Sequence, residues 1–254
     1  MVVPGHPHVG LQTVSWLFAG EVEHRDTTGA HALVRPGEVN LMTAGAGIAH
    51  SEFSTPATRT LHGVQLWVAL PDRHRDAPPA FEHHVPVPVE RAGARILVLV
   101  GELAGDRSPV TTYSPLVGAE IGLAPGARLE LAVDPGHEHG VLVDTGAATV
   151  DGRPLAAGRL LYRAPGDARL VLAAAGERPA RVVLLGGEPL GEPLVMWWNF
   201  VGRTHEEIAG YRAQWAAERA GRVDGPGRFG RFPDAWGVTL PAPELPNARL
   251  RPRR

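Results

Sequence analysis

The chain has 254 residues, 44% of them hydrophobic, and a formal net charge of −2 at pH 7, which gives no electrostatic case for binding nucleic acid or a membrane surface. It contains no cysteine, so disulfides, thiolate nucleophiles, cysteine-type zinc sites and iron–sulfur clusters are excluded. Any transition metal would have to be bound by histidine, aspartate or glutamate, and the chain has 12 histidines.

Short strands are the elements that the first part of the chain predicts. Turn residues recur roughly every 8–12 positions, a spacing typical of an all-β sandwich or barrel. The glycine-rich stretch TAGAG (43–47) reads as a bend between two of the strands. The expected strands cover residues 11–19, 21–26, 31–34, 38–42, 48–53 and 61–70.

A second block of short strands follows and resembles the first. The phrases FAGEVEHRDTTG (18–29) and DTGAATVDG (144–152) occupy corresponding places, which indicates an internal duplication of a β-domain. We therefore expect a first barrel over 1–72, a Pro-rich linker over 73–90, a second barrel over 91–192, and a C-terminal region over 193–254.

One helix is predicted near the C-terminus, over about residues 204–220. Thr204 and Glu207 form a capping box, and Ile208, Tyr211 and Trp215 fall on one face. Residues 222–254 are rich in glycine, proline and arginine and are expected to form a mobile or peripheral tail. Four arginines lie within the last six residues, but a nucleic-acid role for them is not expected.

The chain lacks the features of a membrane or secreted protein. No apolar run approaches the roughly 18 residues that a membrane-spanning helix requires. The N-terminus also lacks a charged region followed by an apolar segment, the pattern of a signal peptide. We expect a soluble cytoplasmic protein with no membrane partner.

Two short histidine motifs carry the chemistry. His6 and His8 precede the first expected strand, and His50 and Glu52 follow the TAGAG bend. In an extended chain, residues i and i+2 project to the same face. If the strands bring both pairs together, three imidazoles and one carboxylate converge, a donor set that suits Fe, Mn, Ni, Cu or Zn and leaves positions open for catalysis. The alternative is that each histidine is an ordinary surface residue.

The other histidines give weaker signals. His24 and His31 flank a hairpin turn and are expected to be exposed, and His83 and His84 read as part of a solvated loop. The motif HEH (137–139) in the second block is the one alternative metal motif, but it does not align with the motifs of the first block. We expect HEH to be a surface loop and the second barrel to lack a metal.

An alignment of the two blocks by their turn glycines supports that expectation. It places Val171 and Ala173 opposite His50 and Glu52. Two apolar residues therefore stand where the first block has half of its ligand set, and the second block would be structural or would bind a partner.

Several longer motifs resemble the pirin family of bicupins. They are HPHVGLQTVSWLFAGEVEHRDTTG (6–29), PGEVNLMTAGAGIAHSE (36–52), LHGVQLWVALP (61–71), GGEPLGEP (186–193) and NFVGRTHEEI (199–208). The resemblance implies two tandem cupin, jelly-roll-like β-barrels with a mononuclear non-haem iron in the N-terminal one. His6, His8, His50 and Glu52 stand where the family places its ligands. Family members include quercetin 2,3-dioxygenases and nuclear proteins that act as redox-sensitive transcriptional cofactors.

The chain departs from the family pattern in two places. Pirins usually carry a further segment before the HPH motif, whereas His6 here follows only five residues. Either the start of the sequence is truncated or the first barrel is open on that side. Gln12 stands where ordinary cupins have a glutamate ligand, and we assign it to packing around the site rather than to the metal.

Two functions fit these features. The first is an Fe(II)-dependent dioxygenase that acts on a flavonol-like aromatic such as quercetin, with O₂ as co-substrate. Glu52 is then a ligand that switches to general base when substrate binds. The second is a metal-bearing, redox-sensing regulatory protein that binds a protein partner without turnover, through the second barrel and the C-terminal helix.

Overall fold

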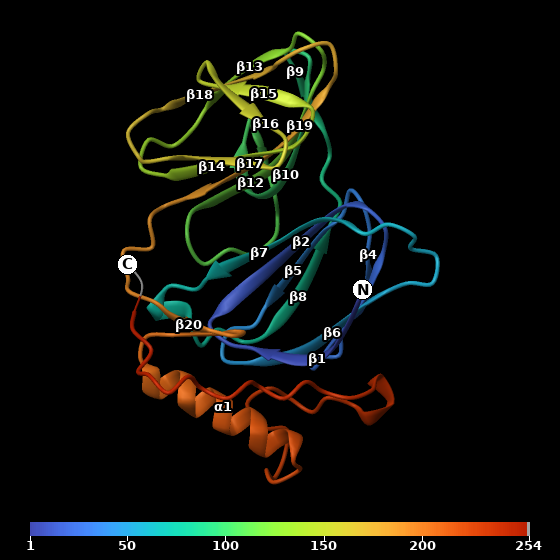
Figure 1. Cartoon of the computed structure of the whole chain (residues 1–254), viewed down its shortest axis with the longest axis vertical. Coiled ribbons are helices and arrows are strands. Elements are labelled where there is room, and N and C mark those ends of the chain that lie inside the picture. The colour runs from blue at the N-terminus through green and yellow to red at the C-terminus, as the bar shows by residue number, and fades with distance from the viewer. Residues whose placement is uncertain (253–254) are drawn as a thin grey trace. The chain divides into compact units, whose positions relative to one another are not determined.

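The computed structural model describes residues 1–252 and divides into two compact units (Figure 1). The first unit comprises Met1–His83 together with the chain from Gly191 onward, and the second comprises His84–Leu190. Arg253 and Arg254, half of the terminal arginine cluster, lie outside the described residues. The expected all-β fold with one C-terminal α-helix and an irregular tail is confirmed.

Two four-stranded antiparallel sheets form the body of the first unit, in the orders β1-β6-β3-β4 and β7-β2-β5-β8, and β20 and β21 form a separate pair. The strands are β1 (Val2–His8), β2 (Leu11–Ala19), β3 (Val22–Asp26), β4 (His31–Val34), β5 (Val39–Thr43), β6 (Ile48–Ser54), β7 (His62–Ala69), β8 (Ala80–His84), β20 (Val195–Trp197) and β21 (Phe200–Gly202).

The apolar strand β2 anchors the core of this unit. Most of its residues are buried, as expected for a strand covered on both faces, and Trp16 is among the largest fully buried side chains. Leu11 of β2, Met42 of β5 and Ile48 of β6 belong to one hydrophobic cluster that connects the two sheets. This cluster holds β6, the strand that carries His50 and Glu52, against the opposite sheet.

The segment expected as a linker contains structure that belongs to the first unit. A short 3₁₀ helix, η1, covers Asp72–His74, and β8 then adds a fourth strand beside β5 (Figure 1). Phe81 of β8 packs against the cluster that connects the sheets. His83, expected in a loop, is thus a strand residue, although its side chain is exposed and contacts Glu38 at 3.2 Å.

The second unit is also built from two sheets. Their orders are β11-β10-β12-β19-β14-β17, with β9 paired to β10, and β13-β18-β15-β16. Its main core cluster consists entirely of Ala, Val, Leu and Ile. The strands are β9 (Val89–Arg91), β10 (Ala94–Leu103), β11 (Asp106–Arg107), β12 (Leu116–Leu123), β13 (Arg128–Ala132), β14 (Glu138–Thr145), β15 (Ala147–Val150), β16 (Arg153–Ala156), β17 (Arg159–Arg163), β18 (Arg169–Ala174) and β19 (Ala180–Gly187).

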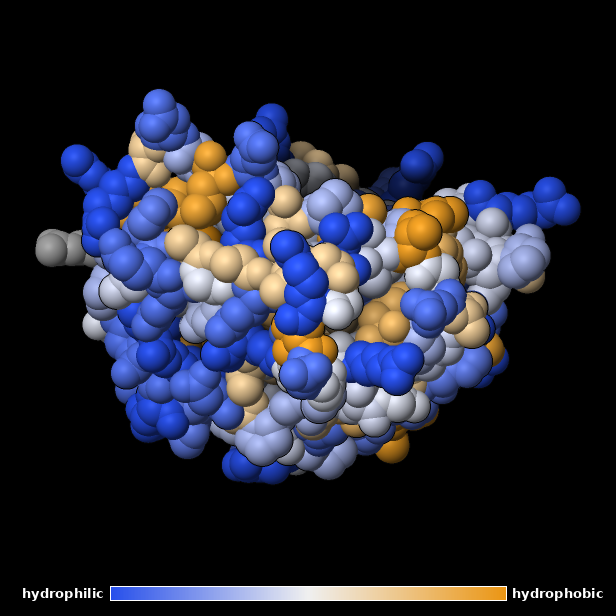
Figure 2. All heavy atoms as spheres, turned by 90° about the horizontal axis from the view of Figure 1, so that it is seen from below, coloured by the Kyte–Doolittle hydropathy of each residue, from blue (hydrophilic) through white to orange (hydrophobic). Residues whose placement is uncertain are grey.

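The helix α1 (His205–Arg219) forms where the capping box predicted it. The Thr204 side chain accepts a hydrogen bond from the backbone N–H of Glu207, and Ile208, Tyr211 and Trp215 form its buried face. No helix within residues 1–252 is long and apolar enough to cross a membrane. Seen from the side of α1, hydrophobic side chains form separate patches among hydrophilic ones (Figure 2).

The segment after α1 packs against the first unit through aromatic and backbone contacts. Phe229 is fully buried in a cluster with Phe200 and Trp215. Thr27 donates a hydrogen bond from Oγ1 to the Phe229 carbonyl at 2.6 Å, and a parallel bridge joins Gly5 to the segment just after the short 3₁₀ helix η2 (Asp234–Trp236). The expectation of a peripheral tail is therefore wrong for this stretch, because a buried aromatic residue and backbone hydrogen bonds hold it in place.

Arg228 is the side chain that fixes this segment to the TAGAG bend. Its Nη1 donates to the Ala46 carbonyl and its Nε to Gln214 Oε1, both at 2.6 Å, and its guanidinium lies over the Tyr211 ring. Gly47, with φ of +152°, makes room, since a Cβ there would lie 2.7 Å from Arg228 Cγ.

Replacing Arg228 by glutamine is expected to lower the free energy of unfolding by about 1–2 kcal/mol, because hydrogen bonds from a charged donor and a cation–π contact are lost. Urea unfolding followed by far-ultraviolet circular dichroism measures the change. Arg231→Gln, which removes the same charge at an exposed position, is the control and should stay near wild type. An equal effect of both substitutions would show that charge, rather than these contacts, matters.

Candidate metal centre

Neighbouring strands of the sheet β1-β6-β3-β4 supply the candidate ligands. His6 and His8 lie on β1, and His50 and Glu52 lie on β6. The two strands pair antiparallel with His6 directly opposite His50. Because alternate residues of a strand share a face, the i and i+2 spacing of both motifs places these side chains on the inner side of the sheet.

The three imidazoles lie in mutual contact. Their ring centroids are 5.0 Å apart for His6 and His8, 4.3 Å for His6 and His50, and 4.9 Å for His8 and His50. One ring nitrogen of each lies within 4.8 Å of those of the other two, and all three residues are buried. The fold thus brings together three of the four residues that the sequence predicts as ligands.

Hydrogen bonding leaves ring nitrogens of this cluster without protein partners. The Pro4 carbonyl lies 2.9 Å from His6 Nδ1 and can only accept, so His6 carries its proton on Nδ1 and keeps a lone pair on Nε2. His8 Nδ1 and His50 Nε2 are buried and have no hydrogen-bond partner among the described residues. Buried nitrogens without partners are costly, and a bound cation would satisfy them.

Burial keeps the cluster neutral. It lowers the pKa of His6, and together with the charges of neighbouring imidazoles it lowers the pKa values of His8 and His50 well below 6.5. Neutral imidazoles are the form that binds metals. The residues present therefore fit a divalent first-row metal.

Glu52 lies on the other side of His50. Its carboxylate groups with His24 and His50 rather than with His6 and His8, and Gln65 Nε2 donates to Glu52 Oε1 at 2.8 Å. Burial raises the pKa of Glu52 above 4.5, while His24 and the hydrogen bond from Gln65 act in the opposite direction. The carboxylate is thus adjacent to the three-histidine cluster and is held by an amide.

His24 is the residue that the sequence interpretation missed. It was expected to be exposed beside a hairpin turn, but only 3% of its surface is accessible. On β3, Val22, His24 and Asp26 are buried while Glu23 and Arg25 are less so, which is the alternation of a half-buried strand. That alternation in VEHRD is the signal that would have placed His24 inside; His31 is exposed as expected.

Aromatic and amide side chains surround the cluster. Trp67 of β7 lies edge-on to His8, with ring centroids 5.3 Å apart, and is 41% exposed. Phe81 of β8 stacks on His24 at 4.6 Å. Gln12 is buried and donates a hydrogen bond to Thr43 Oγ1, which is consistent with a packing role.

The second unit has aliphatic residues at the corresponding positions. Across β1, β6 and β3, the row of paired residues that ends at the last residue of β3 is His6, His50 and Asp26. Across β13, β18 and β15, the row that ends at the last residue of β15 is Leu129, Leu172 and Val150. Two residues further along, on the same face of each sheet, Glu52 pairs with His24 in the first unit and Ala174 pairs with Ala148 in the second.

The glycine-based alignment, which chose Val171 and Ala173, is therefore one residue out. Leu170 and Leu172, rather than Val171, belong to the core cluster, so they are the inward-facing residues of β18.

The HEH motif lies at the start of β14, and its surface-loop assignment is wrong for His139. That residue is 3% exposed and shares the inward face of the strand with Val141 and Val143. The ring centroids of His137 and His139 are 6.2 Å apart. Within the described residues, neither belongs to a group of three or more side chains that lie close enough to hold a metal.

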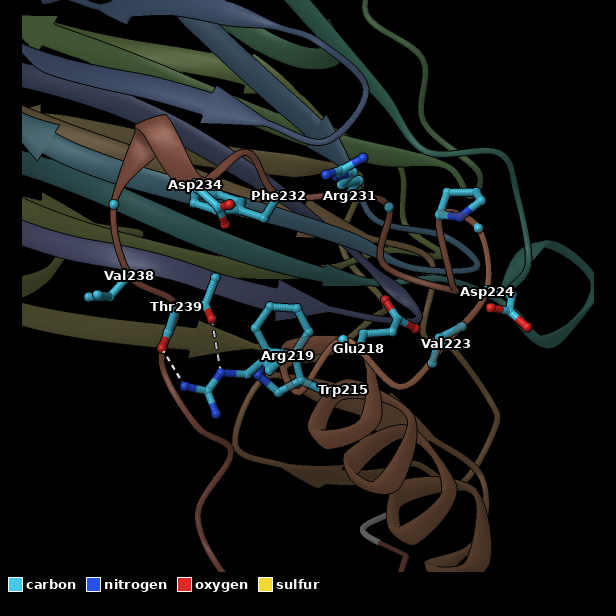
Figure 3. Close-up of a pocket in the computed structure, with 15 residues that line it drawn as sticks. Trp215, Glu218, Arg219, Val223, Asp224, Arg231, Phe232, Asp234, Val238 and Thr239 are labelled. Atoms are coloured by element: carbon cyan, nitrogen blue, oxygen red, sulfur yellow. Dashed lines mark hydrogen bonds between the residues drawn. The ribbon is translucent and has the colours of Figure 1, made fainter.

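A separate hollow lies between the end of α1 and the C-terminal segment (Figure 3). Trp215, Glu218 and Arg219 of α1 line one side, and Phe232 and Thr239 line another. Arg219 donates hydrogen bonds to the side chain and carbonyl of Thr239 across it, at 2.9 and 2.8 Å. The residues that line it include none of the candidate ligands, so this hollow reflects how the segment packs.

Comparison with known proteins gives consistent matches for both units. The pirin family model matches residues 1–68, and the model of the pirin C-terminal cupin domain matches residues 118–221. A relative from Pseudomonas aeruginosa, provisionally named a quercetin 2,3-dioxygenase, is 45% identical over 97% of this chain and 76% of its own length. A pirin-like protein from Caulobacter vibrioides is 38% identical over 94% and 81%.

Solved structures match as well. The crystal structure of a quercetin 2,3-dioxygenase from Acinetobacter baumannii superposes with a TM-score of 0.90 at 38% identity, covering 99% of this chain and 81% of that one. Two tandem cupin units, expected from the sequence, are thus the architecture of this chain.

Proposed function

Since this chain belongs to the pirin family, we propose that its first unit holds one divalent metal, iron in the first place, and that the protein is a dioxygenase of flavonol-like aromatics such as quercetin. The observation that carries the proposal is the convergence of His6, His8 and His50, with His8 Nδ1 and His50 Nε2 buried and without a hydrogen-bond partner among the described residues. The quercetin 2,3-dioxygenase names of a 45% identical relative and a 38% identical solved structure support the choice of substrate class.

His6, His8 and His50 are the ligands in this proposal, and Glu52 is the fourth. Iron is favoured by the family; manganese, nickel, copper and zinc accept the same imidazole and carboxylate donors. When bound, the metal supplies a Lewis acid and a template for substrate and O₂.

In this proposal Glu52 switches from ligand to general base when the substrate binds. Burial raises the pKa of Glu52 above that of an ordinary glutamate, which makes its carboxylate a stronger base. Gln65, which donates to Glu52 and to Ser15 Oγ, holds the carboxylate in place. Glu52 then takes the proton of the flavonol hydroxyl, and the substrate binds as its anion.

Trp67 provides the contact for an aromatic substrate. The Trp67 indole is partly exposed and contacts His8. An aromatic substrate that reaches the three histidines would therefore contact this indole. Offset or edge-to-face contacts between aromatic rings contribute about 0.5–1.5 kcal/mol beyond the buried area. The proposed partners are therefore a small aromatic molecule and O₂.

An aerobic assay with quercetin tests the function. Protein loaded with one equivalent of Fe(II) is expected to consume quercetin and O₂ in equal amounts, which absorbance and an oxygen electrode measure. Protein treated with chelator is the matched control and should consume neither. Fully iron-loaded protein that leaves quercetin unchanged would contradict the dioxygenase and favour the regulatory alternative, in which the metal site controls binding of a protein partner.

A further inference from the structure

A buried histidine–aspartate pair lies directly behind His50. His24 and Asp26 are on β3, which pairs with β6 so that Asp26 is opposite His50 and His24 is opposite Glu52. Asp26 is fully buried and His24 nearly so. His24 Nε2 lies 2.9 Å from Asp26 Oδ2, and His24 Nδ1 lies 3.3 Å from His50 Nδ1. Three buried side chains thus form one hydrogen-bonded line.

Asp26 is fixed as an acceptor at the end of this line. Its other oxygen, Oδ1, accepts hydrogen bonds from the backbone N–H and the hydroxyl of Thr28, at 2.8 and 2.5 Å, and from the N–H of Ala30 at 3.3 Å. These contacts belong to the turn after β3 and keep the carboxylate oriented. Oδ2 therefore stays directed at His24, which must donate from Nε2.

Asp26 fixes the proton on His24 Nε2, and the remaining donor and acceptor roles are part of the proposal. It assigns His24 its single-proton form, which carries a lone pair on Nδ1. With that assignment, the hydrogen-bond contact between the two Nδ1 atoms at 3.3 Å requires His50 to donate from its Nδ1. His50 is left with its lone pair on Nε2, the buried nitrogen that has no hydrogen-bond partner within residues 1–252.

We propose that Asp26 and His24 set the tautomer and ring orientation of His50, so that its Nε2 lone pair faces the cluster with His6 and His8. This inference rests on the proposed metal site and makes His24 a positioning residue. Histidine ligands generally donate their second ring N–H to a fixed acceptor, and loss of that acceptor typically lowers metal affinity by about 10–100-fold.

His24 also belongs to a second group, with His50 and Glu52, whose ligand atoms lie within 4.8 Å of one another. If His24 were itself a ligand, its Nδ1 lone pair would be committed to the metal and would not accept from His50. Two observations favour a hydrogen bond from His50 to His24 over a metal bond to His24. The Asp26 carboxylate accepts from His24 Nε2, and His50 Nε2 has no hydrogen-bond partner among the described residues.

The second unit provides an internal comparison. At the positions that correspond to His50, His24 and Asp26 it has Leu172, Ala148 and Val150, all fully buried. The unit without the histidine cluster therefore also lacks the His–Asp pair. This is expected if the function of the pair is to position a histidine of the cluster.

Nuclear magnetic resonance of the metal-free protein with ¹⁵N-labelled histidine tests the tautomer directly. Wild-type His50 is expected to carry its proton on Nδ1, and in His24→Gln this preference should be lost, since glutamine retains a donor for Asp26 but offers no acceptor at the Nδ1 position. A wild-type His50 that carries its proton on Nε2 would overturn the proposal, whatever metal the protein binds.

Calorimetric titration with Zn²⁺ tests the consequence. His24→Gln is expected to bind Zn²⁺ about 10–100-fold more weakly at unchanged stoichiometry. His24→Asn, whose amide oxygen occupies the Nδ1 position, should restore most of the affinity. Equal losses of Zn²⁺ affinity in both variants would mean a merely structural role for His24 and would overturn the proposal. Zn²⁺ binding that is undetectable in both variants would make His24 a ligand. A wild-type protein that binds no Zn²⁺ would instead contradict the metal site itself.

Discussion

Replacing His50 by alanine is expected to abolish both metal binding and flavonol turnover. His50 is the one imidazole shared by the two groups of candidate ligands, and it contacts His6, His8 and His24. Lewis-acid stabilisation by a bound metal contributes several kcal/mol to the transition state. Because each 1.36 kcal/mol changes the rate tenfold, the loss in turnover is on the order of a thousandfold or more.

Metal content by elemental analysis and quercetin consumption measure the two losses. The matched control is His137→Ala, which removes a histidine of the second unit outside either ligand group. It should keep one metal per chain and full turnover. Circular dichroism shows whether His50→Ala remains folded. A folded His50→Ala protein that retains its metal and its activity would refute the assignment.

Acidification is expected to destabilise the metal-free protein below about pH 6.5, the ordinary pKa of histidine. Burial, and for His8 and His50 the neighbouring imidazoles, lower the pKa values of all three ring systems in the folded state. The unfolded chain therefore takes up protons first as the pH falls. Stability is full above 6.5 and is lost as the pH falls toward the folded-state pKa values.

Each imidazole contributes a slope of at most about 1.4 kcal/mol per pH unit, so the three together set an upper limit of about 4 kcal/mol per pH unit. Glu52 acts in the opposite direction, because its raised pKa makes the folded state hold a proton above pH 4.5. Three imidazoles outweigh one carboxyl, and the net effect is a loss of stability in acid.

Urea unfolding between pH 5 and 8 measures this dependence in the presence of chelator. His50→Leu, which introduces the residue found at the corresponding position of the second unit, removes one titrating group and should flatten the slope. A free energy of unfolding that stays constant or rises between pH 7 and 5 would contradict a buried, neutral histidine cluster.

The candidate ligand motifs could be predicted because their spacing depends only on strand periodicity. His6 and His8, like His50 and Glu52, are two residues apart, and any strand conformation places each pair on one face. That the two pairs meet follows from the pairing of β1 with β6, which the sequence indicated only through its family resemblance. The helix was equally predictable, since its capping box and its buried face are patterns within a short stretch of sequence.

The role of His24 was harder to predict because it depends on long-range pairing. His24 and His50 are 26 residues apart, and their contact exists only because β3 pairs with the far edge of β6. Phe229 illustrates the same limit: nothing in the glycine- and arginine-rich sequence around it gives a periodic signal, yet it is fully buried. The one-residue error at Val171 shows that turn glycines do not fix which face of a strand points inward.

An anomalous difference map from crystals of iron-loaded protein, recorded at the iron absorption edge, tests the central claim most directly. One strong peak is expected per chain, at bonding distance from a ring nitrogen of His6, His8 and His50, with Glu52 as the fourth protein ligand. A peak bound by His24 in place of His6 and His8, a peak in the second unit, or no peak in fully loaded protein would contradict the site described for this fold.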